Sequence, residues 1–528
     1  MSDAQAAPDA DASWKPKHNP WLIAVGVTLA TFMEVLDTTI VNVALPHIAG
    51  SLSASNDEAT WALTSYLVAN GIVLTISGWL GDILGRKRYF VICIIMFTVC
   101  SFMCGAATSL GQLILFRLLQ GFFGGGMQPN QQSIILDTFP IAKRGAAFGV
   151  AAMATIVAPV LGPTLGGYIT DTFDWRWIFY INVPIGIVAA IWVYVVVEDP
   201  PWVKARRNRG IDFVGLGLIT LGLGCLEIFL DRGVDDDWFE SGFIQLMAVL
   251  AALGILGAIA WLSFAKKPIV HLDVFKDRNY TVGCVMIAAT GGLLYASVVM
   301  IPQMVQQYLG YNATWSGLIL SPGGILMIVL IPIVGRVMKV VAARYLVALG
   351  FTIMGFAFLY SSHLAQNIDF QTLVGMRLFQ TSALAFLFVP ISTVAYMTLP
   401  RERNGDGVAL FSMFRNVFGS VGIALSTASV TESAQAHQNF LSQYASPFHQ
   451  PFNNLVATYE KALVAAGQTA QAAHEMALGQ VLRTIRAQAA IMAYSDTFVY
   501  CAIVAFAVVP LTFLMTSRKS VGGPGGAH

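Results

Sequence analysis

The segments FRLLQG (residues 116–121) and MRLFQT (residues 376–381) place an arginine and a glutamine at the same spacing within two apolar stretches. A second pair, DTFPIAKRG (137–145) and MTLPRERNG (397–405), matches through a threonine, a proline and a glycine. All matching positions are separated by the same offset of 260 residues. A constant offset across several features predicts a chain built from two duplicated halves in parallel orientation.

The composition indicates a membrane protein. Of the 528 residues, 56% are hydrophobic and only 11% are charged, whereas soluble domains carry about 25% charged residues. The net charge of +1 provides no basic surface for nucleic acid. The six cysteines lie in apolar runs without CxxC spacing, so we interpret them as buried hydrophobic residues and not as a disulfide framework or a metal site.

Apolar segments long enough to cross a bilayer recur along the chain. A spanning helix needs about 20 residues, and its backbone must be satisfied internally. The sequence therefore predicts an all-α membrane protein with fourteen transmembrane helices, near residues 20–42, 60–80, 89–108, 111–136, 146–168, 176–197, 212–231, 241–264, 280–307, 314–336, 344–362, 371–398, 406–430 and 493–516.

The duplication divides these helices into two six-helix bundles with two inserted helices between them. The expected parts are a cytoplasmic tail (1–19), the first bundle (20–198), a basic linker with the inserted helices (199–279), the second bundle (280–516) and a cytoplasmic tail (517–528). Glu227 lies in an inserted helix, where we interpret it as a packing or partner-facing group.

A long Ala-rich segment, 431–492, joins the last two predicted spans and favours helix. We interpret it either as a solvated helical hairpin that caps the protein or as a docking surface for an external partner. The basic loops, which include GRKRY (85–89) and VKARRNRG (203–210), follow even-numbered spans. The positive-inside rule then places both termini in the cytoplasm and segment 431–492 on the outer side.

The first predicted span contains two acids. In FMEVLDTTIVNVALP (32–46), Glu34 and Asp37 are three residues apart and share one helix face. A buried ionised acid costs roughly 3 kcal/mol on insertion scales, and mutual repulsion further opposes ionisation of both. An acid that binds a proton in one conformation and releases it in another would couple transport to protons; the alternative is an interfacial or structurally neutralised acid. The positions 260 residues later are Leu294 and Ser297.

Arg117 lies in the middle of the fourth predicted span, where a lone cation is costly. It is a candidate ion-pair partner for one of the two acids. The alternative is a purely structural tie between helices, and Arg377 favours it, because the second half keeps the arginine without a matching acid.

Several motifs resemble the major facilitator superfamily and, within it, the fourteen-helix drug:proton antiporters. They are GWLGDILGRKR (78–88), RLLQG (117–121), APVLGPTLGGYI (158–169), LDTTIVNVALP (36–46), DWRWIFYINVPIG (174–186) and LDRGVDDDWF (230–239). The resemblance implies that the helices of Asp37 and Arg117 meet at the centre of the fold. It extends to the inner-membrane pumps of tripartite efflux systems, which implies a periplasmic adaptor protein and an outer-membrane channel as partners.

Two of these motifs are candidate gating elements. Gly78, Asp82, Gly85, Arg86 and Arg88 are expected at a cytoplasmic corner, where Asp82 can meet a helix N-terminus or a basic residue and hold the inner gate closed. The other motif offers small residues that allow close helix approach, and we expect it to control the outward-facing gate: Gly162, Pro163, Gly166 and Gly167.

Candidate substrate contacts come from polar, Met and aromatic residues at cavity-facing positions. Met and aromatic surfaces suit varied apolar ligands, although each such residue can equally serve packing or interhelical hydrogen bonding. The predicted set is Gln128, Asn130, Gln131 and Gln132, then Tyr295, Gln303, Met304 and Gln306, then Phe386 and Phe388.

The sequence contains no HExxH, GxSxG or Walker A motif, so we expect no enzyme activity, no metal and no cofactor. Energy would come from the proton gradient. The function that we favour is proton-coupled export of hydrophobic, drug-like compounds from a bacterial inner membrane. The alternatives are a stand-alone antiporter, a non-transporting receptor or scaffold, and a porter for one metabolite.

Overall fold

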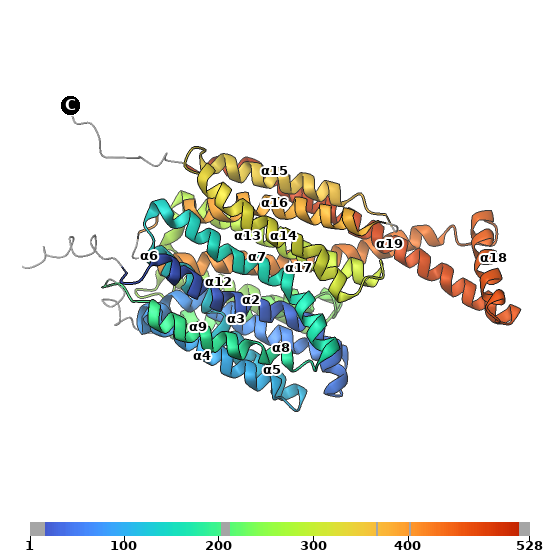
Figure 1. Ribbon diagram of the computed structural model, residues 1–528, viewed down its shortest axis with the longest axis horizontal. Coiled ribbons are helices and arrows are strands. Elements are labelled where there is room, and N and C mark those ends of the chain that lie inside the picture. Colours follow the sequence, from blue (N-terminus) through green and yellow to red (C-terminus); the bar gives the residue numbers. More distant parts are fainter. Residues whose placement is uncertain (1–15, 202–211, 366–367, 401–402, 517–528) are drawn as a thin grey trace, which may run out of the picture.

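The computed structural model describes residues 16–201, 212–365, 368–400 and 403–516, and helices dominate this part of the chain (Figure 1). No β-strand occurs among the described residues. The predicted all-α architecture is therefore confirmed.

The described residues of the first half form eight helices. They are α2 (Pro20–Ser51), α3 (Asn56–Leu84), α4 (Arg86–Gly105), α5 (Leu110–Gly124), α6 (Met127–Thr138), α7 (Ile141–Thr172), α8 (Trp177–Tyr180) and α9 (Asn182–Val196). An insertion follows, with α11 (Phe213–Arg232), η1 (Trp238–Glu240), α12 (Gly242–Phe264) and η2 (Leu272–Lys276). Gly222 of α11 and Gly254 of α12 bring the two inserted helices into backbone contact.

The second half begins after the insertion. Its elements are α13 (Arg278–Gln307), α14 (Ala313–Val337), α15 (Ala343–Ser361), α16 (Phe370–Ala395), α17 (Asn404–Ser442), α18 (Gln450–Ala465), α19 (Ala470–Val508) and η4 (Val509–Leu514).

Twelve helices in the described residues are individually long and apolar enough to cross a membrane, and the bent helix α7 makes a thirteenth when its two pieces are counted as one span. The predicted segment 111–136 is occupied by α5 and α6, which have 15 and 12 residues and are separated at Gly125 and Gly126. Each is shorter than a single span requires. Fourteen spans therefore stay the expected number, with the fourth one broken.

The contacts between the halves occur in equivalent pairs, as the duplication predicts. Helix α7 of the first half packs against α14 of the second, and α17 packs against α3. The offset of 260 residues relates α7 to α17 and α3 to α14, so the two contacts are equivalent under exchange of the halves. Within the halves, α2 packs on α7 as α13 packs on α17. The packing thus follows the pseudo-twofold relation expected from the repeated sequence motifs.

The loops expected in the cytoplasm gather at one end of the bundle. The Trp21 ring lies 5.1 Å from that of Phe139, and the backbone N–H of Lys87 donates to Asp199 Oδ1 at 2.8 Å. The backbone N–H of Thr516 donates to Asn279 Oδ1 at 2.9 Å. Helix α18 lies at the opposite end (Figure 1). This grouping agrees with the alternation of the basic loops along the sequence.

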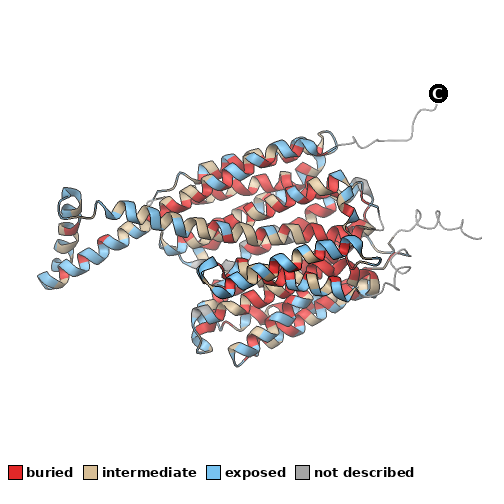
Figure 2. Ribbon diagram, turned by 180° about the vertical axis from the view of Figure 1, so that it is seen from behind, coloured by how far each residue is buried: buried red, intermediate tan, exposed pale blue. Residues whose placement is uncertain are grey.

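Helices α17 and α19 extend well beyond the bundle. Each has 39 residues, which corresponds to about 58 Å at 1.5 Å per residue, whereas the hydrocarbon core is about 30 Å thick. Helix α18 packs on the projecting part of α19 through Val456, Ala477 and Val481. Figure 2 shows that this projecting part is largely exposed, while buried residues concentrate inside the bundle.

Candidate functional site

Asp37 and Arg117 form a fully buried ion pair between α2 and α5. The Arg117 Nη1 atom donates to Asp37 Oδ2 at 2.6 Å, and both side chains are 0% exposed. Asp37 Oδ1 also accepts from Gln120 Nε2 at 3.0 Å and from Asn182 Nδ2 at 2.7 Å. The carboxylate therefore receives three hydrogen bonds from two helices, α5 and α9, and hydrogen bonds to a carboxylate favour its charged form.

The Arg117 guanidinium also has neutral partners. It donates to the Ala62 carbonyl at 3.2 Å and to Gln120 Oε1 at 2.8 Å. Its centre lies 4.2 Å from the Tyr66 ring, where the π face attracts a cation. Arg117 Nη2 is buried without a hydrogen-bond partner in the described part of the chain. These contacts would keep Arg117 in place after the ion pair breaks.

The equivalent place in the second half lacks the acid. Arg377 Nη1 donates to Ser297 Oγ at 2.8 Å and to Gln380 Oε1 at 3.4 Å, and Gln380 Nε2 donates to Ser361 Oγ at 2.8 Å. Ser361 follows by 260 positions Ser101, which bonds Asn182 at 3.0 Å in the first half. At these described positions the two halves thus share one polar framework, and the first half adds a carboxylate where the second half has a serine.

Glu34 is buried one helical turn from Asp37 and has different partners. Its Oε1 atom accepts from the Tyr66 hydroxyl at 3.2 Å and from Asn70 Nδ2 at 3.1 Å, while Oε2 accepts from Gln128 Nε2 at 2.9 Å. Because the ring of Tyr66 also lies against Arg117, one side chain contacts both acidic sites. The two acids therefore belong to one connected polar cluster.

Gln128 joins Glu34 to the second half. Its amide oxygen accepts a hydrogen bond from Arg415 Nη2 on α17, while its amide nitrogen donates to Glu34. Arg415 is 3% exposed and its Nε atom donates to Asn416 Oδ1 at 3.2 Å. An acid of the first half is thus linked through one amide to a cation of the second half, across the interface that must rearrange if the halves move.

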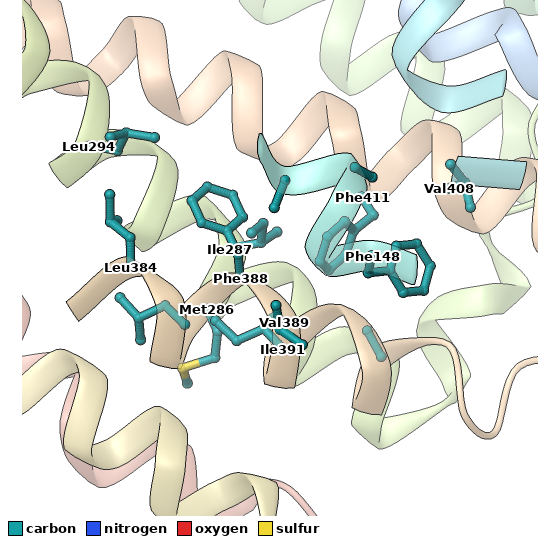
Figure 3. Close-up of a cluster of buried hydrophobic side chains, with 14 of the residues drawn as sticks. Phe148, Met286, Ile287, Leu294, Leu384, Phe388, Val389, Ile391, Val408 and Phe411 are labelled. Atoms are coloured by element: carbon teal, nitrogen blue, oxygen red, sulfur yellow. The ribbon is translucent and has the colours of Figure 1, made fainter. Parts of the chain in front are cut away.

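A small cavity adjoins this link. Its volume is about 20 Å³, which is room for about one water molecule. Figure 3 shows its apolar side, where Phe148 of the first half approaches Phe411, Ile287 and Phe388 of the second. The complete lining is Gln128, Gln131, Gln132, Phe148, Ala151, Ala152, Ile287, Phe388, Ser392, Phe411 and Arg415. The lining combines amides, one arginine and aromatic rings, so it offers both polar and apolar contacts.

The polar side chains of residues 128–132 do not all point towards the cavity. Gln131 lines the cavity and donates to Thr28 Oγ1 at 3.0 Å, and Gln132 lines it while accepting from the Tyr396 hydroxyl at 3.1 Å. Asn130 instead donates to the backbone carbonyl of Arg86 at 2.9 Å, towards α4. In this conformation Asn130 is a helix-packing residue.

The other predicted contacts lie away from the cavity. Phe386 packs towards Gly350 of α15, whereas its neighbour Phe388 is in the lining. Tyr295 packs against Gly419, with the nearest ring carbon 2.5 Å from the position of an added Cβ. Further along α13, Met304 is buried, Gln303 is half-buried and Gln306 is exposed. In this conformation, none of these α13 residues reaches the cavity.

The motif of residues 78–88 lies at a contact between the two halves. A Cβ added to Gly78 would lie 2.6 Å from the carbonyl carbon of Gly405, so α3 and α17 touch through their backbones. Asp82 is buried, and one of its carboxylate oxygens lies 3.7 Å from the Cβ position at Gly405. Because α17 begins at Asn404, this acid faces the positive end of a helix dipole.

The remaining motif residues stay within the first half. Arg86 donates to the Ser133 carbonyl at 3.0 Å and pairs with Asp137. Gly85 has φ +86°, a value that L side chains rarely adopt. Arg88 is exposed.

The glycine motif of α7 packs on α2. A Cβ at Gly162 would lie 2.7 Å from Thr39 Cβ, and one at Gly166 would lie 2.8 Å from Ile40 Cγ1. Gly167 is buried and its carbonyl accepts from Thr170 Oγ1 at 3.1 Å. The side chain of Pro163 lies outside the described residues. Close packing of small residues therefore brings α7 against the helix that carries both acids.

Sequence reasoning assigned no role to Arg415, Asn182, Tyr66 or Asn70. Arg415 carried a usable signal, because it is a lone cation in the predicted span 406–430, as Arg117 is in its own span. Asn182 and Asn70 are polar residues in apolar spans, but their partners are on other helices, and the sequence spacing does not reveal such contacts.

Two duplicated helix bundles that enclose a buried polar cluster define a multi-pass membrane protein of the kind that moves small molecules between two faces. The Major Facilitator Superfamily profile matches residues 27–423, and the chain belongs to this family. The family resemblance of the sequence motifs is thereby confirmed.

Curated relatives cover nearly the whole chain. The chain is 36% identical over 509 residues to the "Multidrug export protein EmrB" of Escherichia coli strain K12, covering 96% of this chain and 98% of that protein. It is 38% identical over 431 residues to the protein of the same name from Haemophilus influenzae, covering 81% and 84%. Among solved structures, a bacterial homolog of the human lysosomal transporter Spinster, inward-facing and unoccupied, superimposes with a TM-score of 0.56 at 16% identity over 94% and 98% of the chains.

Proposed function

We propose that the chain exports hydrophobic, drug-like compounds across the bacterial inner membrane in exchange for protons. The observation that carries the proposal is the buried Asp37–Arg117 pair, whose counterpart in the second half is the uncharged contact of Arg377 with Ser297. An asymmetric acid in an otherwise duplicated framework indicates a role beyond the stability of the fold. The similarity to proteins named for multidrug export supports the substrate class.

The proton step would act on Asp37. When a proton binds to Oδ2, the charge of the carboxylate is lost and the ion pair with Arg117 Nη1 breaks. Arg117 then keeps its bonds to Gln120 and the Ala62 carbonyl and its contact with the Tyr66 ring. Release of the proton restores the pair. This exchange gives two arrangements of α2 relative to α5, and conformational coupling requires such a difference.

Glu34 would transmit protonation to the interface between the halves. A proton on Oε2 weakens this atom as the acceptor of the Gln128 amide N–H, and Gln128 is the group that binds Arg415 of α17. The amide can then turn and release the guanidinium towards the cavity, where it can meet a polar part of the substrate. Proton binding on one half would in this way alter the contact with the other half.

Alternating access would open one end of the interface between the two halves, here called the seam, at a time. At the cytoplasmic end the halves touch through Gly78 and Gly405, and at the other end Gly317 of α14 contacts Thr164 of α7. Both contacts would close access to the central cavity. We propose that residues 20–198 and 280–516 act as the two moving bundles, with the remaining predicted residues in substrate contact when an end opens.

The proposal also includes partners and orientation. The end that carries the basic loops would face the cytoplasm together with both termini, and the projecting helices α18 and α19 would then face the periplasm. A projecting helical pair of this length offers a surface to a periplasmic adaptor that continues to an outer-membrane channel. The alternative is a stand-alone antiporter that releases its substrate into the periplasm.

The deciding experiment measures proton exchange in proteoliposomes. Addition of ethidium, a lipophilic dye, to wild-type vesicles should drive proton movement in the opposite direction, and Asp37→Asn should abolish it. Glu34→Gln should weaken it, while Ser297→Ala at the equivalent position of the second half should leave it intact.

Proton exchange that persists at the wild-type rate in the Asp37→Asn protein would refute this mechanism. Dye binding without any flux in wild type would instead favour a receptor or scaffold, and flux restricted to one polar metabolite would favour a specific porter.

A further inference from the structure

Glu227 of the inserted helix α11 lies against both halves of the protein. It is 5% exposed and belongs to a candidate membrane span. Its Oε1 atom lies 3.6 Å from the Cβ position of Gly71 on α3, and its side chain forms a hydrogen bond with Ser420 on α17. The inserted helix α11 therefore takes part in the interface between the halves, because Glu227 lies between α3 and α17.

No cation compensates this acid. In the described ranges, no Lys, Arg or His side chain forms an ion pair with Glu227. The neighbouring charge on α11 is Asp231, another acid, and Arg232 is engaged by Thr60 and Asp236. Helix α12, which packs on α11, contains no ionisable residue.

The charged groups on the other packed helices are also engaged elsewhere. On α17, Arg415 binds Gln128. Glu34 of α2 is on the other side of α3, where it binds Asn70, the residue next to Gly71. An ionised carboxylate without a cation inside a membrane span carries a large free-energy cost. An ionisable group in such a position therefore suggests a function. The neutral acid, with its O–H and the Ser420 hydroxyl as partners, fits these surroundings.

A route for protons leads to Glu227 from one end of the bundle. Asp231 follows Glu227 by one helical turn, is exposed and is bound by Thr64 of α3. Side chains four residues apart on a helix have Cβ atoms about 6 Å apart, so one water molecule can bridge the two carboxyl groups. Asp231 is thus an entry point from solvent, and Glu227 is the next acceptor inside.

We infer that Glu227 is a second proton-carrying site, loaded through Asp231 and emptied when α3 and α17 separate. This inference rests on the proposed proton-coupled export. A proton from water at the Asp231 end forms an O–H bond with a carboxyl oxygen of Glu227. When the seam opens at the cytoplasmic end, water reaches the group and takes the proton, leaving a hydrated carboxylate. The inserted helices thereby carry a proton in addition to the one on the first half.

The first test detects the proton without any substrate. Infrared spectra of the purified full-length protein at neutral pH should contain the carbonyl stretch of a protonated carboxylic acid, and Glu227→Gln should remove one such band. Glu198→Gln, at a half-exposed position paired with Lys17, is the matched control and should remove none. Identical protonated-acid bands in wild type and Glu227→Gln would overturn the inference.

The second test counts protons during transport. In proteoliposomes with a pH difference of one unit, the steady-state ethidium gradient of Glu227→Gln should be about tenfold lower than that of wild type, since each proton contributes 1.36 kcal/mol per unit. Glu227→Asp should restore the wild-type gradient. An unchanged gradient in Glu227→Gln would refute the second site while leaving the proposed export intact. Absence of flux in wild type would refute the export itself, and the infrared result would still decide on Glu227.

Discussion

Arg377 donates a hydrogen bond to Ser297 at 2.8 Å in the place where, 260 residues earlier, Arg117 is paired with Asp37 at 2.6 Å. The glutamine one turn later on each arginine helix is also retained and bonds its arginine in both halves. The duplication has therefore preserved the arginine as part of the scaffold, and the acid is the feature that distinguishes the halves.

This asymmetry predicts different outcomes for matched substitutions of the two arginines. Arg117→Gln leaves Asp37 buried without its cation, which should cost about 3–5 kcal/mol and abolish proton exchange. Arg377→Gln removes a hydrogen bond to a hydroxyl and should change stability by about 1 kcal/mol, with exchange retained. Thermal unfolding in detergent and proton exchange in proteoliposomes check both. Equal loss of exchange in the two variants would contradict the assignment of coupling to the first half.

A second prediction concerns the Gln128 bridge. Gln128→Leu removes the amide that joins Glu34 to Arg415 and leaves two buried charged groups without that partner. We expect a stability loss of about 1–3 kcal/mol and at least a tenfold slower exchange of dye for protons. Gln131→Leu, whose partner is Thr28, is the control at a neighbouring cavity position. It should alter dye affinity more than exchange rate. The reverse pattern would show that Gln128 only contacts substrate.

A third prediction concerns closure at the end of the bundle where Gly78 contacts Gly405. Gly78→Val places atoms where the Gly405 backbone lies, so the contact of α3 with α17 cannot form. The population should shift towards the state that is open at this end, and a cysteine introduced near Gly405 should react faster with a hydrophilic maleimide. Gly217→Val is the control, since nothing lies within 4 Å of its Cβ position. Equal cysteine reactivity in the two variants would show that the contact does not gate access.

A fourth prediction separates transport from partner docking. Deleting residues 431–492 removes the projecting parts of α17 and α19 together with α18, whose packing cluster is separate from the bundle core. Proton-coupled dye exchange in proteoliposomes should therefore be retained. Efflux from whole Gram-negative cells should fall at least tenfold if an adaptor binds there. Full efflux from cells would favour the stand-alone antiporter.

The sequence predicts the helical fold well because its signals are local or repeated. Apolar length identifies membrane helices without knowledge of tertiary contacts, and the constant offset relates the halves before any helix is placed. The break between α5 and α6 is harder to predict, because Gly125 and Gly126 are tolerated in a continuous apolar helix. In the fold, the packing around this break requires glycine. A side chain at Gly126 would meet the Tyr89 ring, whose nearest carbon lies 2.7 Å from the Cβ position.

The candidate site could be predicted only in part. Glu34, Asp37 and Arg117 are recognisable because charge is rare in apolar spans. The direction in which a polar side chain points cannot be recognised in the same way. Asn130 is two positions from Gln128, so it points roughly to the opposite side of the helix. There it donates to the carbonyl of Arg86. The same geometry separates Phe386 from Phe388. The role of Arg415 depends on Gln128, a partner 287 residues away, and on contact between halves that the repeat alone does not specify.

Helix α17 connects events at opposite surfaces of the membrane. It begins beside Gly78 at the contact between the halves, carries Arg415 and Ser420 through the interior, and continues without interruption to Ser442 beyond the bundle. A rigid rod of about 58 Å that tilts by about 10° at one end displaces its far end by about 10 Å. In the proposed transport cycle, the position of the projecting tip would therefore follow the opening and closing of the contact at Gly78, and a protein bound to the tip would be displaced once in every cycle.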